Sequence, residues 1–169
     1  NKLQQNDKWS TLAGGACRDW YLGNTASDLD FYIHYSGKYP QWALCEHFGN
    51  LLGCEMKIVG KPKGYPDQPD NDITYTQNPD VEYVLGGIVG GVPVQIVIMN
   101  CLVNPEQMVR SFCFDICQAY TRNVDEIHLT KAFNEAVKHK VIRVTGEFWS
   151  QKEAYIEKIK SKFPDYLHI

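Results

Sequence analysis

The stretch that decides the fold is "GGACRDWYLGNTASDLDFYI", residues 14–33. It opens with a Gly-Gly turn, continues through residues compatible with a short helix, and reaches Gly23, which is a good helix stop. Residues 24–27 have the composition of a turn. The run Leu29–Tyr35 is rich in Leu, Phe, Ile and Tyr, so it predicts a β-strand. The stretch therefore predicts a turn, a short helix, a second turn and a strand, in that order.

Two carboxylates, Asp28 and Asp30, lie at the start of the predicted strand and are separated by one residue. Side chains at positions i and i+2 of a strand point to the same face of the sheet. Two carboxylates on one face repel each other unless a cation lies between them. Mg²⁺ binds few carboxylates together with phosphate oxygens and water. The pair therefore predicts a site for Mg²⁺ or Mn²⁺, where two ions can promote in-line displacement at phosphorus.

The glycines before the carboxylates predict a phosphate-binding turn. Gly14 and Gly15 have no Cβ, so their backbone N–H groups can approach an anion closely. A helix that begins there adds donors and a favourable dipole, and Arg18 on its first turn can reach a phosphate as a forked donor. A lone Gly-Gly is usually a turn and a lone Asp-x-Asp usually a solvated strand end. It is their ordered combination within one short stretch that favours a site for a triphosphate and a metal ion.

The same stretch resembles the head motif of the DNA polymerase beta-like nucleotidyltransferase superfamily, especially the branch of tRNA CCA-adding enzymes and bacterial poly(A) polymerases. That branch has Gly-Gly-x-x-Arg-Asp, then Leu-Gly, then Asp-x-Asp, and this chain matches it at Gly14, Gly15, Arg18, Asp19, Leu22, Gly23, Asp28 and Asp30. The resemblance implies that the two glycines hold the triphosphate, that Arg18 contacts phosphate or braces the loop, and that Asp28 and Asp30 bind Mg²⁺. It also implies that a hydroxyl attacks the α-phosphorus of an NTP and releases pyrophosphate.

Two departures from the family pattern leave alternatives open. The family usually places a third carboxylate on a later strand, and Gln95 stands at that position in this chain. Asp115 can replace the missing metal ligand from a neighbouring element, or it can cap or pair structurally. Alternatively, Gln95 marks a pocket that binds nucleotide but turns over slowly or not at all. The residues after Asn123 are too few for the neck, body and tail helices with which CCA-adding enzymes hold tRNA, so we do not expect CCA addition itself.

The rest of the chain alternates between predicted helices and strands. The apolar spacing of Tyr39–Cys54 predicts a helix, and the Pro, Asp and Asn residues of Gly60–Pro79 predict a loop. "VEYVLGGI" and "VPVQIVIM" predict two strands of a hairpin that turns at Gly90-Gly91. No Lys-Ser or Lys-Thr follows "GGIVGG", residues 86–91, so it is not a P-loop. Three further helices are expected, over Pro105–Tyr120 with Asn104 as N-cap, Asn123–Val141 and Gly146–Phe163.

These elements predict an α+β fold, with a small mixed β-sheet and flanking helices on one side. Strands and helices alternate too little for a doubly wound parallel sheet. We expect a nucleotidyltransferase core over residues 1–122 and a helical C-terminal extension over residues 123–169, in one compact unit. A chain of 169 residues is long enough for one domain with a proper core.

Composition narrows the function classes. The net charge of −3 argues against a generally basic nucleic-acid surface, although the lysines of residues 152–162 form either an RNA-contacting or a simply solvated helix face. The chain has no apolar run of about 20 residues, so no membrane partner is expected. The six cysteines lack metal-site spacing, which predicts reduced thiols in a cytoplasmic protein. The alternative is a zinc site at Cys45, His47 and Cys54.

The sequence therefore favours a minimal metal-dependent nucleotidyltransferase that takes an NTP as donor. The acceptor hydroxyl belongs to an RNA 3′ end, a protein or a small molecule. The alternative is a catalytically weak or inactive module of the same fold that binds nucleotide or a partner. A weaker third hypothesis is a structural partner protein with no ligand, for which neither nucleotide nor Mg²⁺ would raise thermal stability.

Overall fold

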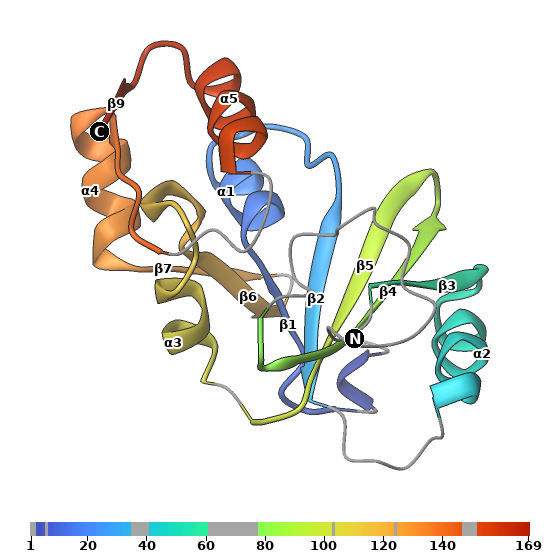
Figure 1. Cartoon of the computed structure of the whole chain (residues 1–169). Coiled ribbons are helices and arrows are strands. Elements are labelled where there is room, and N and C mark those ends of the chain that lie inside the picture. The colour runs from blue at the N-terminus through green and yellow to red at the C-terminus, as the bar shows by residue number, and fades with distance from the viewer. Residues whose placement is uncertain are drawn as a thin grey trace.

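Seven strands form one sheet in the computed structural model, which describes residues 3–5, 7–34, 41–60, 78–102, 104–123, 125–146 and 152–169 (Figure 1). Their order across the sheet is β3-β4-β5-β2-β1-β6-β7. The strands are β1 (Thr11–Ala13), β2 (Leu29–His34), β3 (Met56–Gly60), β4 (Val81–Val89), β5 (Val92–Met99), β6 (Ala119–Asn123) and β7 (Glu126–Leu129). Two short strands, β8 (Val141–Ile142) and β9 (Leu167–His168), pair separately.

The described residues form five α-helices around the sheet. They are α1 (Gly15–Tyr21), α2 (Gln41–Leu52), α3 (Pro105–Arg110), α4 (Lys131–His139) and α5 (Lys152–Lys162), and the described residues also form two short 3₁₀ helices, η1 (Leu3–Gln5) and η2 (Asp115–Cys117). Within the large sheet β2 and β5 are parallel, and the other neighbouring strands are antiparallel. The predicted α+β class, with a mixed sheet and flanking helices, is confirmed.

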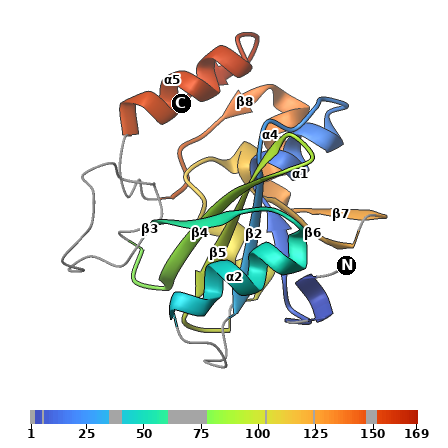
Figure 2. The ribbon, with the colours of Figure 1, turned by 90° about the vertical axis from the view of Figure 1, so that its right-hand side faces the viewer.

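The two faces of the sheet carry different helices, because successive side chains on a strand alternate between faces. Ile33 of β2 belongs to a core cluster with Leu44 and Phe48 of α2, and α2 lies on the side of the sheet that faces the viewer in Figure 2. Tyr32 belongs to another cluster, with Met108 and Val109 of α3. The expectation that all helices lie on one side is therefore wrong, because the short α3 buries its apolar side chains on the opposite face.

The predictions for the first half of the chain are largely confirmed. The strand expected over Leu29–Tyr35 appears as β2, and the helix expected over Tyr39–Cys54 appears as α2. Residues 35, 39 and 40 of these two predictions lie outside the described residues. The hairpin of β4 and β5 turns where expected, since Gly90 and Gly91 have φ of 58° and 84°. A type I′ turn requires positive φ at both central residues, which glycine adopts without strain. Residues 61–77 of the predicted loop lie outside the described residues.

The helix predicted over Pro105–Tyr120 is too long. The N-cap is confirmed, because the Asn104 side chain accepts hydrogen bonds from the backbone N–H groups of Glu106 and Gln107. The helix nevertheless ends at Arg110, and Phe114 then forms an isolated antiparallel bridge with Val144. This long-range pairing replaces the helical hydrogen bonds that local propensity favours. Cys113 and Cys117 are spaced to share one face of the predicted helix, but the helix ends before both of them, so they do not.

The helix predicted over Asn123–Val141 is wrong in its first part, which is strand β7 paired with β6. The helix in this region begins only at Lys131, where the Thr130 hydroxyl accepts a hydrogen bond from the Phe133 N–H. The pairing of β6 with β7 crosses the predicted boundary at residues 122 and 123, and the division into core and extension stays a prediction. The last predicted helix, Gly146–Phe163, appears as α5, and residues 147–151 lie outside the described residues.

Candidate active site

The Gly-Gly turn lies at the end of β1, against the start of β2. The Gly14 N–H donates to the carbonyl oxygen of Ala119 at 2.8 Å, and the Gly14 carbonyl accepts from the Arg18 N–H at 3.1 Å. Gly14 has φ of 82° and is the N-cap of α1. Its neighbour Ala13 is the register partner of Asp30 in the antiparallel pair of β1 and β2. Sheet pairing therefore brings the glycine turn next to one of the two predicted metal-binding carboxylates.

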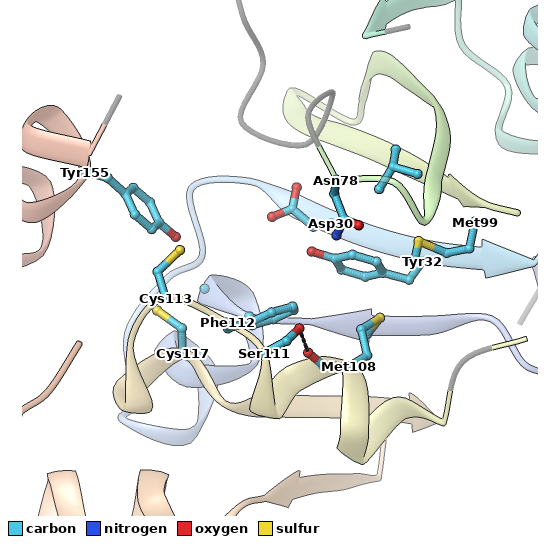
Figure 3. Close-up of a pocket in the computed structure, with 13 residues that line it drawn as sticks. Asp30, Tyr32, Asn78, Met99, Met108, Ser111, Phe112, Cys113, Cys117 and Tyr155 are labelled. Atoms are coloured by element: carbon cyan, nitrogen blue, oxygen red, sulfur yellow. Dashed lines mark hydrogen bonds between the residues drawn. The ribbon is translucent and has the colours of Figure 1, made fainter. Parts of the chain in front are cut away.

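One cavity joins these elements. Gly14, Gly15 and Asp30 all line it, and Figure 3 shows Asp30 on β2 and Tyr155 on α5 approaching it from different parts of the chain. The remaining wall is mostly apolar, with sulfur atoms and a few polar groups. It consists of Tyr32, Asn78, Val81, Met99, Met108, Ser111, Phe112, Cys113, Cys117 and Tyr155.

Unlike Asp30, Asp28 lies before the first residue of β2 and does not line the cavity. Strand β2 begins at Leu29, so the same-face argument from strand geometry covers Asp30 but not Asp28. Asp28 is half-buried, accepts a hydrogen bond from the Ser27 hydroxyl at 3.0 Å, and is not among the residues that line the cavity. The structure brings Asp30 together with the glycines and leaves Asp28 two residues away along the chain.

Arg18 lies behind the turn and does not line the cavity. Its side chain is buried, its Nε donates to Asp19 Oδ1 at 2.8 Å, and its Nη1 donates to Cys117 Sγ at 3.2 Å. Burial alone lowers the pKa of the Arg18 guanidinium, but Cys117 and Asp19 outweigh this effect, so the pKa is raised and the charge is retained. Of the two roles that the resemblance implies for Arg18, this position suits bracing of the loop.

The structure does not bring Asp115 to the cavity. Asp115 is buried at the start of η2, and its Oδ1 accepts hydrogen bonds from the backbone N–H groups of Ile116 at 2.8 Å and Arg143 at 3.0 Å. Its Oδ2 lies 3.5 Å from Arg143 Nη1. Burial raises the pKa of the Asp115 carboxyl in spite of these partners. The carboxylate thus joins η2 to the segment after β8.

Gln95 lies at the position where the resemblance predicts a third carboxylate. It is the register partner of Asp30 in the parallel pair of β2 and β5, and paired residues of neighbouring strands present their side chains on the same face. Among the described residues, no group of three or more His, Cys, Asp and Glu side chains gathers to hold a metal ion. A metal ion at this site would therefore depend on Asp28, Asp30 and non-protein oxygens.

The alternative zinc site at Cys45, His47 and Cys54 is wrong, since the described residues form no such cluster. The Cys54 thiol lies 3.5 Å from the sulfur of Met56, and the His47 ring packs edge-on against Phe48 with centroids 5.0 Å apart. All six cysteines are free thiols. Burial raises the pKa of the Cys17 thiol to about 12, as expected of a packed, unreactive side chain.

Sequence reasoning missed the contribution of α5. Tyr155 of this helix lines the cavity, and Lys162 at its end forms an ion pair with Asp19 at 2.5 Å. The lysines of this helix were expected to be solvated or to contact RNA, and Lys160 is indeed on an exposed face, paired with Glu157. No local pattern distinguishes Lys162 from its neighbours, because its partner is 143 residues away.

The fold is that of known tRNA-processing enzymes. A CCA-adding enzyme from Thermotoga maritima in complex with tRNA superposes with a TM-score of 0.63 at 15% identity, over 99% of this chain and 37% of that one. A CCA-adding enzyme with CTP gives 0.60 at 14% identity, over 95% and 36%. A tRNA nucleotidyltransferase with a primer tRNA and an ATP analogue gives 0.58 at 13% identity, over 100% and 46%.

This chain has the nucleotidyltransferase fold. The resemblance predicted from residues 14–33 is thereby confirmed at the level of the fold. The chain spans less than half the length of these three structures. No family model and no curated protein matches the sequence. In the part of the chain that the structure describes, no helix is both long and apolar enough to span a bilayer.

Proposed function

We propose that the chain is a metal-dependent nucleotidyltransferase that moves an NMP from an NTP to a hydroxyl acceptor and releases pyrophosphate. The observation that carries this proposal is the shared cavity of Gly14, Gly15 and Asp30. The fold, which is that of enzymes solved with CTP, ATP and tRNA, supports it further. An RNA 3′ end, a protein hydroxyl or a small molecule could be the acceptor.

The donor atoms at the site suit Mg²⁺ or Mn²⁺. Asp30 and Asp28 would supply two carboxylates, and the triphosphate and water would supply the remaining oxygens, which is the ligand set that Mg²⁺ prefers. When bound, the metal neutralises phosphate charge and activates the attacking oxygen. Gln95 would lie beside this group as a neutral amide.

The chain's own residues would bind and orient the donor. The phosphates would lie against the backbone of Gly14 and Gly15, which lines the cavity. Glycine lets an anion approach the backbone closely, but the Gly14 N–H already donates to the Ala119 carbonyl oxygen and would not bind the phosphates itself. Arg18 would hold this turn in place from behind, through Asp19 and Cys117. The apolar wall formed by Tyr32, Met108 and neighbouring side chains would limit the access of water to the α-phosphorus.

The test is a double substitution, Asp28→Asn with Asp30→Asn. We expect it to abolish transfer from an NTP labelled at the α-phosphate while the fold is retained. The matched control is Asp125→Asn with Asp165→Asn, which removes two exposed carboxylates and should leave transfer unchanged. Full transfer by the Asp28/Asp30 variant would refute the proposal.

Gln95 favours a second candidate, a nucleotide-binding module that turns over slowly or not at all. Two carboxylates hold a divalent ion less firmly than three, because each ligand charge adds to its affinity. Under this alternative an NTP raises the melting temperature of the protein, but no pyrophosphate appears with any acceptor.

We further propose a cytoplasmic location, which the six free thiols support.

A further inference from the structure

We propose that Lys162, at the end of α5, is a positioning residue for the Gly14–Gly15 turn. It acts through Asp19 and Arg18, and does not touch the cavity itself. The inference rests on the proposed function in one respect, namely that this turn binds a nucleotide.

Arg18 lies directly against the turn. A Cβ placed on Gly15 would lie 3.4 Å from Arg18 Nη2, so the guanidinium packs against the backbone that would face phosphate. The Arg18 side chain is only 5% exposed, and its Nε lies 2.8 Å from Asp19 Oδ1. A buried guanidinium needs such a partner, because an unpaired charge is costly in a water-excluded site. The position of Arg18 therefore depends on the position of Asp19.

Asp19 in turn is held from α5. Its side chain is 2% exposed, and its second oxygen lies 2.5 Å from Lys162 Nζ. The next residue, Phe163, packs its ring against the Arg18 guanidinium, with 5.4 Å between the guanidinium carbon and the ring centroid. One buried carboxylate thus joins a cation of α1 to a cation of α5, and the end of α5 contacts both members of the Arg18–Asp19 pair.

The three charged side chains, those of Arg18, Asp19 and Lys162, also determine the net charge behind the Gly14–Gly15 turn. Arg18 and Lys162 carry two positive charges and Asp19 carries one negative charge, which leaves one net positive charge. The described residues that line the cavity include the carboxylate of Asp30 and no Lys or Arg. Loss of the Lys162 charge would leave a neutral Arg18–Asp19 pair behind the turn. Lys162 therefore affects both the placement of the turn and its attraction for an anion.

The test compares Lys162→Met and Lys162→Gln with Lys162→Arg and with a control, Lys160→Met. Lys160 is on the same helix but forms an exposed pair with Glu157. The first readout is hydrogen exchange of the backbone amides of Gly14 and Arg18, at a temperature where circular dichroism shows each variant folded. We expect about tenfold faster exchange in the Met and Gln variants, and rates near wild type in the Arg variant and the control.

The second readout is calorimetric titration with ATP and with CTP, each in the presence of Mg²⁺. We expect about tenfold weaker binding by Lys162→Met and recovery by Lys162→Arg. Unchanged exchange in both the Met and Gln variants, or failure of arginine to restore it, would overturn the positioning role. If the exchange rates change as expected but the wild-type protein binds neither nucleotide, the positioning role stands and the nucleotide proposal fails.

Discussion

Asp30 on β2 and Gln95 on β5 are register partners in the parallel pair of strands at the centre of the sheet. A carboxylate at residue 95 would therefore stand beside that of Asp30. We expect Gln95→Asp to lower the melting temperature without metal, because like charges repel, and to strengthen the response to Mg²⁺. Tenfold tighter binding would add roughly 3–5 °C to the Mg²⁺-induced rise in melting temperature.

The control for this prediction is Gln107→Asp, which adds the same charge on an exposed position of α3 outside the cavity. It should not change the response to Mg²⁺. Equal responses of the two variants would mean that no metal ion binds next to Asp30.

Substitution of each glycine of the turn by alanine should affect the stability of the protein differently. Gly14 has φ of 82°, and a Cβ there would lie 3.4 Å from the ring of Phe112. Gly14→Ala should therefore lower the free energy of unfolding by about 1–3 kcal/mol. Gly15 is the first residue of α1, and a Cβ there meets Arg18 Nη2 at van der Waals distance. Gly15→Ala should keep the stability within about 1 kcal/mol of wild type.

The nucleotide affinity separates the two effects, because a methyl group at Gly15 would lie against the Arg18 guanidinium behind the turn and would disturb the contact that supports the backbone facing the phosphate. Gly15→Ala should bind ATP more weakly than wild type, as measured by calorimetry, although its thermal denaturation is nearly unchanged. Wild-type affinity in this variant would show that ATP binding does not depend on the contact between Arg18 and the turn.

The parts of the site that the sequence predicts are those whose partners are close along the chain or are fixed by strand alternation. Gly14, Gly15 and Asp30 fall within one stretch, and the pairing of β1 with β2 brings them together. The position of Gln95 is expected only from the resemblance, because strand alternation alone does not show that its strand pairs with β2. The resemblance of this stretch to a known motif also predicts the fold.

The missed parts depend on distant contacts. Lys162 contacts Asp19 from the far end of the chain, and nothing in the sequence of α5 marks it. The helix expected to run through Phe114 is replaced there by a bridge to Val144. Strand β7 is only four residues long, so its alternation is too short to outweigh the helical pattern around it. In the last two cases tertiary pairing overrides the local preference for helix.

Asp115 provides a test that depends on pH. Burial raises the pKa of its carboxyl above the usual value of 3.8, so the native state holds this proton more tightly than the unfolded chain. Between the two pKa values unfolding releases a proton, and the contribution of Asp115 to stability therefore decreases as pH rises through that window. Asp115→Asn removes this titration but keeps an oxygen that can accept from the N–H groups of Ile116 and Arg143. The melting temperature of the variant minus that of wild type should thus be more positive at pH 7 than at pH 4.

The same substitution tests whether Asp115 binds metal. Because Asp115 does not line the cavity, we expect Asp115→Asn to transfer label from an NTP at the wild-type rate and to respond normally to Mg²⁺. Asp125→Asn, an exposed change, serves as the control for the loss of one negative charge. Loss of transfer in the Asp115 variant alone, at a temperature where both variants are folded, would instead place this carboxylate among the metal ligands.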